Sequence, residues 1–292
     1  MFEGFTRKKL RANGVEINTL VKGDGPPLLL LHGYPQSHLI WHRVAPALAR
    51  HYTVVATDLR GYGDSEKPAG LADHSNYSKR EMARDQVEVM RQLGFESFYL
   101  CGHDRGGRVS HRLAVDHPNA VKRMMLLDIS PTLTMYEQTS MEFARAYWWW
   151  FFLIQPTPFP EAMVAAAPET FLQKKIGWGH AGLSAFTPET YAAYLAHVSD
   201  PATMHAMCED YRAAASIDLE HDRADRAAGK KVSCPIHAIW GEHGVVARCF
   251  KPVEDWRQVA DDVRGSTLPC GHYIPEEVSE ALLQEMLAFF RA

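Results

Sequence analysis

The sequence predicts an α/β protein with a mostly parallel sheet of eight strands, flanked by helices and interrupted by an inserted helical cap. Two observations carry this prediction: short apolar strands alternate with helical stretches, and one long aromatic segment breaks the alternation. A chain of 292 residues, 46% of them hydrophobic, is long enough to bury one large core. Alternation of this kind is typical of right-handed βαβ units around a parallel sheet.

The predicted strands are short, and most are continuously apolar, as expected for strands buried on both faces of a parallel sheet. They lie at residues 15–21, 28–31, 53–57, 98–101, 124–127, 237–240 and near 267–268. The basic cluster Arg7, Lys8 and Lys9 is too short to indicate nucleic-acid binding, so we interpret it as a solvated strand end.

Helical stretches lie between these strands. A capping box from Ser78 to Glu81 predicts the start of a helix that continues to about Leu93. A second helix follows Gly106, and residues 278–290 form the last one.

The alternation stops between about residues 133 and 219, where Trp, Tyr, Phe and Ala are frequent and prolines interrupt the helical spacing. We therefore predict a core formed by residues 1–132 and 220–292, with residues 133–219 inserted as a helical cap. A cap over the carboxyl ends of parallel strands encloses the place where such sheets bind ligands.

The most informative motif is Gly102-His103-Asp104-Arg105-Gly106, which follows an apolar strand and precedes a helix. This is the layout of a nucleophile elbow, with Asp104 where serine is commoner. Small residues are needed at both ends because a side chain there would clash with the neighbouring strand and helix. The motif predicts an α/β-hydrolase fold whose nucleophile is the Asp104 carboxylate.

The base and its acid partner are expected after later strands. His272 follows the last predicted strand, where this fold delivers its base. Asp128 comes directly at the end of the strand at 124–127, the sixth of the eight strands of this fold, whereas Gly244 occupies the alternative acid position after the seventh, at 237–240. We therefore choose Asp128 to orient His272, with Glu242 as the fallback.

The backbone N–H groups of Tyr34 and Arg105 are the expected oxyanion-hole donors. His32 and Gly33 shape the turn before Tyr34. The glycine-rich stretch 58–65 lacks the lysine and the spacing of a phosphate loop, so we interpret it as a structural turn.

An aspartate nucleophile suits displacement at saturated carbon, because the resulting ester can be hydrolysed by water with the help of a base. Halide displacement and epoxide opening are both reactions of this type. Arg105 and Arg108 lie three residues apart beside Asp104, so they share a helix face and could bind an anionic substrate. Two guanidinium groups there would also keep Asp104 ionised.

Over nearly its whole length the sequence resembles the haloacetate dehalogenases, including fluoroacetate dehalogenases, of the α/β-hydrolase superfamily. The motifs that carry the resemblance are residues 32–36, 58–65, 102–106, 128–132, 147–148, 155–156, 209–214 and 271–272. The resemblance implies Asp104 as nucleophile, His272 as base and Asp128 as its partner. It also implies that Arg105 and Arg108 hold the substrate carboxylate.

In the cap, the resemblance implies that Trp150 and Tyr211 donate hydrogen bonds to the departing halide, with Trp178 lining the pocket. The family's halide pocket commonly has His-Trp where this chain has Trp149-Trp150. An indole offers an N–H group, but it is larger than imidazole and cannot become cationic. We therefore expect weakened fluoroacetate activity, with chloroacetate or bromoacetate turnover retained.

Two other functions remain open. An epoxide hydrolase would use the same nucleophile with tyrosine donors, for which Tyr147 and Tyr211 are available. A non-catalytic ligand-binding protein could keep the scaffold, although the complete set of Asp104, His272 and Asp128 disfavours it.

The cysteines indicate a cytoplasmic location, and the resemblance to the haloacetate dehalogenases implies an enzyme that needs no cofactor and no metal. The five cysteines are odd in number and widely spaced, which predicts free thiols in a reducing compartment and no cysteine zinc site. The N-terminus lacks the apolar stretch of a signal peptide, and the longest apolar run, 147–154, is far below the roughly 20 residues of a membrane span. We expect a small haloacid substrate, no nucleic-acid or membrane partner, and a homodimer as the candidate assembly.

Overall fold

A computed structural model describes residues 1–291 of the chain. Eight strands form one sheet in the order β1-β2-β4-β3-β5-β6-β7-β8. Strands β1 and β2 run antiparallel to their neighbours, and all other pairs are parallel. The strands are β1 Thr6–Ala12, β2 Val15–Lys22, β3 Pro27–Leu31, β4 Thr53–Thr57, β5 Phe98–His103, β6 Val121–Leu127, β7 Ile236–Gly241 and β8 Val263–Leu268. The predicted α/β-hydrolase architecture with a mostly parallel eight-stranded sheet is confirmed.

The apolar runs of the central strands fill two cores, one on each face of the sheet. In β3, Leu29 and Leu31 belong to one core, while Leu28 and Leu30 belong to the other, because successive side chains of a strand point to opposite faces. This explains why β3 is continuously apolar, whereas β1, at the sheet edge, exposes Arg7, Lys8 and Lys9.

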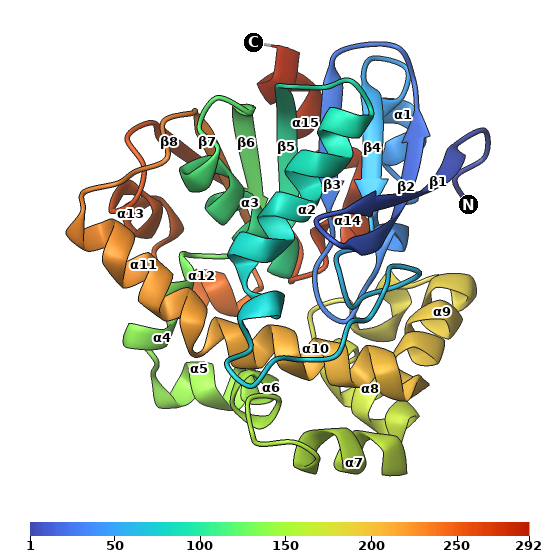
Figure 1. Cartoon of the computed structure of the whole chain (residues 1–292), viewed down its shortest axis with the longest axis vertical. Helices are drawn as coiled ribbons and strands as arrows, with labels where there is room; N and C mark the ends of the chain where they lie inside the picture. Colours follow the sequence, from blue (N-terminus) through green and yellow to red (C-terminus); the bar gives the residue numbers. More distant parts are fainter. Residues whose placement is uncertain (292) are drawn as a thin grey trace.

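Helices cover both faces of the sheet. Helices α2 (Lys79–Gln92) and α3 (Arg105–Asp116) lie in front of the strands in Figure 1, and α1 (Ala45–Leu48) and α15 (Ser279–Arg291) lie behind them. The start of α2 is as predicted: Ser78 is the N-cap residue, and its hydroxyl accepts a hydrogen bond from the backbone N–H of Glu81. The remaining short elements of the core are η1 His38–Trp41, η2 Ser75–Tyr77, α12 Val245–Cys249, α13 Pro252–Arg257 and α14 Ile274–Glu277.

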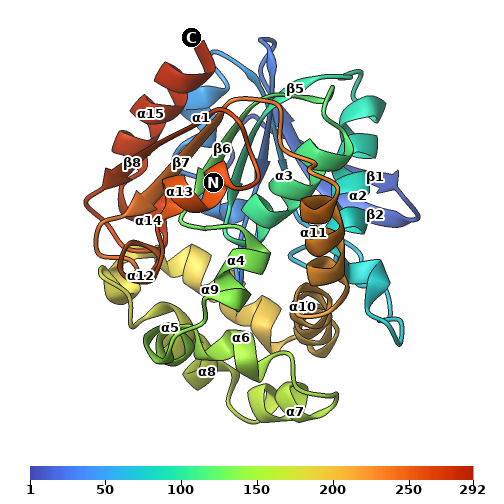
Figure 2. The same ribbon diagram turned by 90° about the vertical axis from the view of Figure 1, so that its left-hand side faces the viewer.

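A group of helices between β6 and β7 lies beyond the carboxyl ends of the strands (Figure 1, Figure 2). These helices are α4 Thr132–Glu137, α5 Met141–Ala146, α6 Trp148–Phe152, α7 Phe159–Ala166, α8 Pro168–Ile176, η3 Gly182–Ala185, α9 Pro188–Ser199, α10 Pro201–Ala214 and α11 Ile217–Ala227. They occupy the region where the cap is predicted, and the exact division at residues 133 and 219 stays a prediction. In the part of the chain that the structure describes, no helix is long and apolar enough to cross a membrane.

Candidate active site

Asp104 stands at a sharp turn between β5 and α3, with a φ angle of +46°. A Cβ atom on Gly102 would lie 2.4 Å from Oγ of Ser110, and one on Gly106 would lie 2.3 Å from the carbonyl oxygen of Leu31. Both contacts are impossible for a real side chain, so the glycines of the motif are required by close packing. Because the strained turn is held from both sides, the Asp104 carboxylate is presented at the carboxyl end of the central strand.

The Asp104 carboxylate is buried, with 3% of the residue exposed, and it is held from the loop after β3. Its Oδ1 atom accepts a hydrogen bond of 3.0 Å from the backbone N–H of Tyr34. Burial alone raises the pKa of Asp104, but the electrostatic interactions with His272 and with the Arg108 guanidinium outweigh that effect and hold the pKa well below its usual value. The group is therefore an anion at neutral pH.

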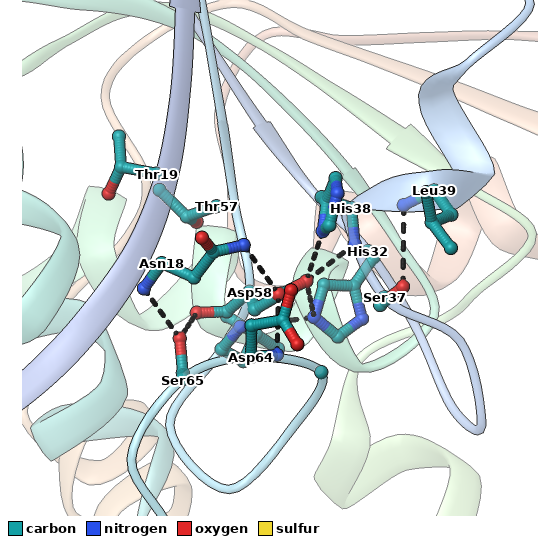
Figure 3. Close-up of polar contacts among 12 residues, drawn as sticks. Asn18, Thr19, His32, Ser37, His38, Leu39, Thr57, Asp58, Asp64 and Ser65 are labelled. Carbon is teal, nitrogen blue, oxygen red and sulfur yellow. Dashed lines mark hydrogen bonds and ion pairs between the residues drawn. The ribbon is translucent and has the colours of Figure 1, made fainter. Parts of the chain in front are cut away.

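The loop that carries Tyr34 is anchored by a second buried carboxylate, Asp58 (Figure 3). Asp58 accepts hydrogen bonds from Nδ2 of Asn18 at 2.8 Å, from the backbone N–H of His38 at 2.7 Å and from the backbone N–H of Asp64 at 2.9 Å. The turn at 58–65 thus ties the loop after β3 to the loop after β4, which agrees with a structural role.

His32 also anchors the loop after β3 that carries Tyr34. Its Nδ1 atom lies 2.8 Å from the carbonyl oxygen of Gly33, and Nε2 accepts a hydrogen bond from the backbone N–H of Leu59 at 3.0 Å. Burial lowers the pKa of His32 to about 4, so the ring is neutral and can donate from one nitrogen while accepting at the other. The ring therefore helps to fix the backbone that leads to Tyr34.

His272 connects two carboxylates. Its Nδ1 atom lies 2.6 Å from Oδ2 of Asp128, and its Nε2 atom lies 3.9 Å from Oδ2 of Asp104. The other oxygen of Asp128 accepts a hydrogen bond of 3.1 Å from the backbone N–H of Gly241. Nδ1 therefore carries the proton, and Nε2, which is buried and has no hydrogen-bond partner among the described residues, faces the nucleophile as an acceptor. Burial raises the pKa of Asp128, and the hydrogen bond from His272 opposes that rise.

The structure also explains why the alternative acid position is empty. A Cβ atom on Gly244 would lie 3.2 Å from Oδ1 of Asp128, so a side chain at position 244 would compete for the space that Asp128 fills. Glu242, the fallback acid, accepts a hydrogen bond from the hydroxyl of Thr267 at 3.0 Å on an exposed surface. The structure brings Asp128, and not Glu242, to His272.

Arg105 points from the start of α3 toward the cap, where Asp210 of α10 holds it. The Asp210 carboxylate accepts from Nε of Arg105 at 2.9 Å and from Nη2 at 2.6 Å. Burial alone raises the pKa of Asp210, but Arg105 and Lys79 outweigh it and hold the pKa below its usual value. The guanidinium stacks on the ring of Tyr211 at 4.2 Å, and among the described residues Nη1 has no hydrogen-bond partner.

Arg108, one turn further along α3, is oriented by Thr132, whose hydroxyl accepts from Nη1 at 2.9 Å. Its guanidinium lies 4.6 Å from the centre of the Trp150 ring, and Nε has no partner among residues 1–291. Burial lowers the pKa of Arg108 and neighbouring Arg105 adds to that effect, so an anion placed between the two would relieve their repulsion. Each arginine thus has one buried nitrogen atom without an acceptor among residues 1–291: Nη1 of Arg105 and Nε of Arg108.

Two aromatic side chains of the cap, Trp150 and Tyr211, lie next to these arginines, and a third, Trp149, contacts Tyr211. Trp150 is fully buried, and its Nε1 atom has no partner among the described residues. Tyr211 packs edge-on against Tyr34, with ring centres 5.1 Å apart, and its hydroxyl accepts from Nε1 of Trp149 at 3.2 Å. Tyr211 can still donate its own hydrogen, whereas the N–H group of Trp149 is already used. The structure brings Trp150 and Tyr211 to the site directly and Trp149 through Tyr211.

Trp178 lies further out, with 40% of the residue exposed, and lines a pocket of about 230 Å³ that leads to His272. Tyr147 and Trp149 also line this pocket. Trp178 therefore lies at the outer end of this pocket, away from Arg105 and Arg108.

Two charged residues that the structure brings close to the site were not predicted from the sequence. Asp210 orients Arg105, and its only signal was its place beside Tyr211 in a matching motif. Lys175 is buried beside Trp149, and helical spacing alone could not show that it faces inward. Within residues 1–291, no group of three or more His, Cys, Asp or Glu side chains is arranged to hold a metal ion.

Comparison with known proteins agrees with this geometry. Residues 26–277 match the model of the alpha/beta hydrolase fold family. A fluoroacetate dehalogenase of Burkholderia sp is 47% identical, with 100% of this chain and 97% of the relative covered. A soluble epoxide hydrolase of Corynebacterium sp. (strain C12) is 32% identical, with 98% and 97% covered.

Solved structures give the same result. A protein of Nostoc sp PCC 7120 that is described as an alpha/beta hydrolase superposes with a TM-score of 0.96 at 54% identity, covering 99% of both chains. The epoxide hydrolase CorEH superposes with a TM-score of 0.89 at 31% identity, covering 98% of this chain and 99% of the other. The chain therefore belongs to the α/β-hydrolase superfamily and, within it, to the haloacetate dehalogenases.

Proposed function

We propose that this enzyme hydrolyses the carbon–halogen bond of small haloacetates, releasing glycolate and halide through an ester on Asp104. One observation supports this most strongly: Nη1 of Arg105 and Nε of Arg108 are buried donors without partners beside an aspartate nucleophile. Buried charged donors are costly unless an acceptor satisfies them. A substrate carboxylate would satisfy both and would place the adjacent carbon next to Asp104.

In the first step, Oδ2 of Asp104 attacks the carbon that bears the halogen. Oδ1 is held by the N–H group of Tyr34, which leaves Oδ2 as the free oxygen. The new C–O bond forms as the carbon–halogen bond breaks, and the halide departs with the bonding electrons. Because both reactants are anions, the charges of Arg105 and Arg108 reduce the repulsion that would otherwise oppose their approach.

The departing halide needs N–H or O–H donors in a site that excludes water. The unpartnered Nε1 of Trp150 and the hydroxyl of Tyr211 supply two such donors. Trp149 donates to the same hydroxyl and thereby orients the Tyr211 hydrogen away from itself, toward the site.

In the second step, Nε2 of His272 removes a proton from water, which attacks Cγ of the Asp104 ester. The 3.9 Å between Nε2 and Oδ2 of Asp104 leaves room for the new atoms once the ester has formed. Negative charge develops on Oδ1, where the N–H group of Tyr34 already donates, and the N–H group of Arg105 is the second expected donor. The intermediate expels the glycolate oxygen, which takes the proton from His272, and Asp104 is regenerated with one oxygen from water.

An epoxide hydrolase is the alternative for the same nucleophile. It needs hydroxyl donors over the site, and the hydroxyls of Tyr147 and Tyr211 are near it. A neutral epoxide would leave the free donors of Arg105 and Arg108 unsatisfied, so the geometry favours an anionic substrate.

The proposed function is tested by measuring halide release from fluoroacetate, chloroacetate and bromoacetate, beside diol formation from neutral epoxides. We expect halide release from haloacetates, abolished in Asp104→Asn, and no epoxide turnover. Turnover of epoxides alone would establish the alternative, and tight binding of haloacetates by the native protein without conversion would establish a non-catalytic protein.

We also propose a cytoplasmic location and a homodimeric assembly. The location is supported by the cysteines, all of which are free: Cys101, Cys208, Cys234, Cys249 and Cys270. Light scattering of the purified protein tests the assembly, since a monomeric mass would refute the dimer.

A further inference from the structure

A lysine is buried in the cap beside the active site. Lys175, near the end of α8, is only 1% exposed. Its Nζ atom donates to the hydroxyl of Tyr273 at 2.7 Å and lies 4.0 Å from the centre of the Trp149 ring. Among residues 1–291, no carboxylate lies within ion-pair distance of this ammonium group. Two of its three N–H donors therefore have no hydrogen-bond acceptor in the described part of the chain.

Packing does not account for a lysine at this position. Methionine would fill a similar volume between Trp149 and Tyr273 without the cost of removing an ammonium group from water. Buried lysines are rare unless an opposite charge or a ligand compensates them. The nearest source of negative charge is Asp104, which acts on Lys175 without contacting it.

Lys175 lines the pocket of about 230 Å³ that reaches His272 from the molecular surface. Three further basic side chains, His180, His243 and Arg248, line its outer part, and the rings of His180 and His243 stack with centres 4.1 Å apart. No lining residue is an aspartate or glutamate. Arg248 donates to the carboxylate of Glu142 at 3.1 Å, so the ammonium group of Lys175, which has no acidic partner among residues 1–291, is the charge in this pocket that attracts a small anion.

We propose that Lys175 and the hydroxyl of Tyr273 form a binding site for a small monovalent anion on the route between the surface and Asp104. The inference rests on the proposed function, in which both the substrate and the released halide are small anions that must pass this pocket. The substrate carboxylate and the departing halide share the required chemistry, since each accepts hydrogen bonds from an ammonium group and a phenol.

Protonation of Lys175 controls this site. Burial lowers the pKa of Lys175 to about 7, while the negative charge of Asp104 opposes that shift. The titratable and charged groups around the lysine are Asp104, Tyr34, His103, His272 and Tyr273, with His180, His243 and Arg248 further out in the pocket. An anion binds the charged form, so its affinity falls as pH rises above about 7, by at most tenfold per pH unit.

Titration of bromide and of acetate tests the site without turnover. Bromide quenches tryptophan fluorescence, and both Trp149, against the lysine, and Trp150, in the proposed halide pocket, can report it. The titration is therefore made in the native protein and in Trp150→Phe, where the saturable quenching that remains and that acetate displaces reports on Trp149. We expect Lys175→Met to weaken both anions at least tenfold and to remove the pH dependence between pH 6 and 8.5. The neighbouring Lys174 is exposed, and Lys174→Met is the matched control that leaves both affinities unchanged. Lys175→Arg keeps the charge and should retain binding.

Comparing acetate with bromide shows whether the site binds the incoming substrate carboxylate or the departing halide. Loss of acetate binding alone assigns the site to the incoming substrate and raises the KM for chloroacetate, whereas loss of bromide binding alone assigns it to the departing halide. Native affinity for both anions in a folded Lys175→Met variant would overturn the inference. If the native enzyme released no halide from any haloacetate, the proposed function would fail, and the titration would still decide whether the anion site exists.

Discussion

Oδ1 of Asp104 accepts a hydrogen bond of 3.0 Å from the backbone N–H of Tyr34, so the two oxygens of the nucleophile are not equivalent. The free oxygen, Oδ2, faces His272 and is the one expected to bond to the substrate carbon. The bound oxygen already occupies the place where negative charge develops when the ester is hydrolysed. One backbone donor thus selects the attacking atom in the first step and stabilises the intermediate of the second.

Removing the base should separate the two steps. Ester formation needs only Asp104, whereas hydrolysis of the ester needs Nε2 of His272 to activate water. In His272→Ala we expect steady turnover of chloroacetate to fall by about 10²–10⁴-fold while a covalent adduct accumulates on Asp104. Intact-mass spectrometry detects the adduct, with Asp104→Asn as the control that forms none. A His272→Ala variant that retains chloroacetate turnover without any adduct would contradict the two-step scheme.

The carboxylate that partners His272 should also work when it is supplied from position 244 in place of position 128. Asp128→Asn removes the charge that stabilises protonated His272, and we expect kcat to fall by roughly 10²–10⁴-fold. Position 244 has ordinary extended backbone, with φ −78° and ψ 167°, and its Cβ would lie 3.2 Å from Oδ1 of Asp128. Asp128 has a φ of +53°, which glycine tolerates, so the double variant Asp128→Gly/Gly244→Asp frees that space and should recover at least tenfold in kcat relative to Asp128→Gly.

Glu242 supplies the matched control for this experiment. Its carboxylate bonds to Thr267 on an exposed surface, so Glu242→Gln should leave the kcat for chloroacetate unchanged. A large loss in Glu242→Gln together with full activity in Asp128→Asn would reverse the assignment of the acid.

Trp149 should set the preference among halides. Its N–H group is used by Tyr211, and the indole cannot become cationic, so fluoride, the most strongly solvated halide, gains least from this pocket. We expect faster turnover of chloroacetate and bromoacetate than of fluoroacetate. Trp149→His should raise the ratio of fluoroacetate to chloroacetate turnover, measured by halide release. If fluoroacetate is already the best substrate of the native enzyme, this expectation is wrong.

Much of the catalytic site could be predicted from the sequence, because its residues follow the ends of predicted strands. Asp104 and Asp128 come directly after β5 and β6, and His272 lies in the loop that follows β8. The carboxyl ends of parallel strands meet at one edge of the sheet, so the meeting of these three residues could be predicted. The cap is different. Helical spacing shows which residues share a face, but it does not show which face meets the core, so Lys175 and the role of Asp210 could be found only from the structure.

Helical spacing also could not predict which cap residues line the entrance of the pocket that leads to His272. Trp178 and Trp149 are both aromatic residues of the cap, and nothing in their local sequence distinguishes a buried position from an exposed one. The antiparallel edge strand β1 was recognised only as a solvated strand end, because Arg7, Lys8 and Lys9 hide its pattern.

A buried glutamate outside the site should make stability depend on pH. Burial raises the pKa of Glu276 from its ordinary value of 4.5 to about 8, although Tyr194 donates to its carboxylate. Between these two values the folded state holds one proton more than the unfolded state, so the free energy of unfolding falls as pH rises, by up to about 1.4 kcal/mol per pH unit. Below the lower value this contribution is fully present, and above about 8 it is lost.

Glu276→Gln should flatten this dependence. Urea unfolding at pH 5 and pH 8 measures it, and we expect a smaller difference in the variant than in the native protein. An equal loss of stability in both proteins would show that Glu276 is already ionised in the folded state.

The central claim is that a side-chain oxygen of Asp104 becomes the hydroxyl oxygen of the product. It is tested most directly by a single turnover of chloroacetate in H₂¹⁸O with enzyme in excess, followed by mass spectrometry of glycolate and of the peptide that contains Asp104. We predict unlabelled hydroxyl oxygen in the glycolate and one ¹⁸O atom in the Asp104 carboxylate. Labelled glycolate with an unlabelled Asp104 would show that water attacks the substrate carbon directly and would contradict the account.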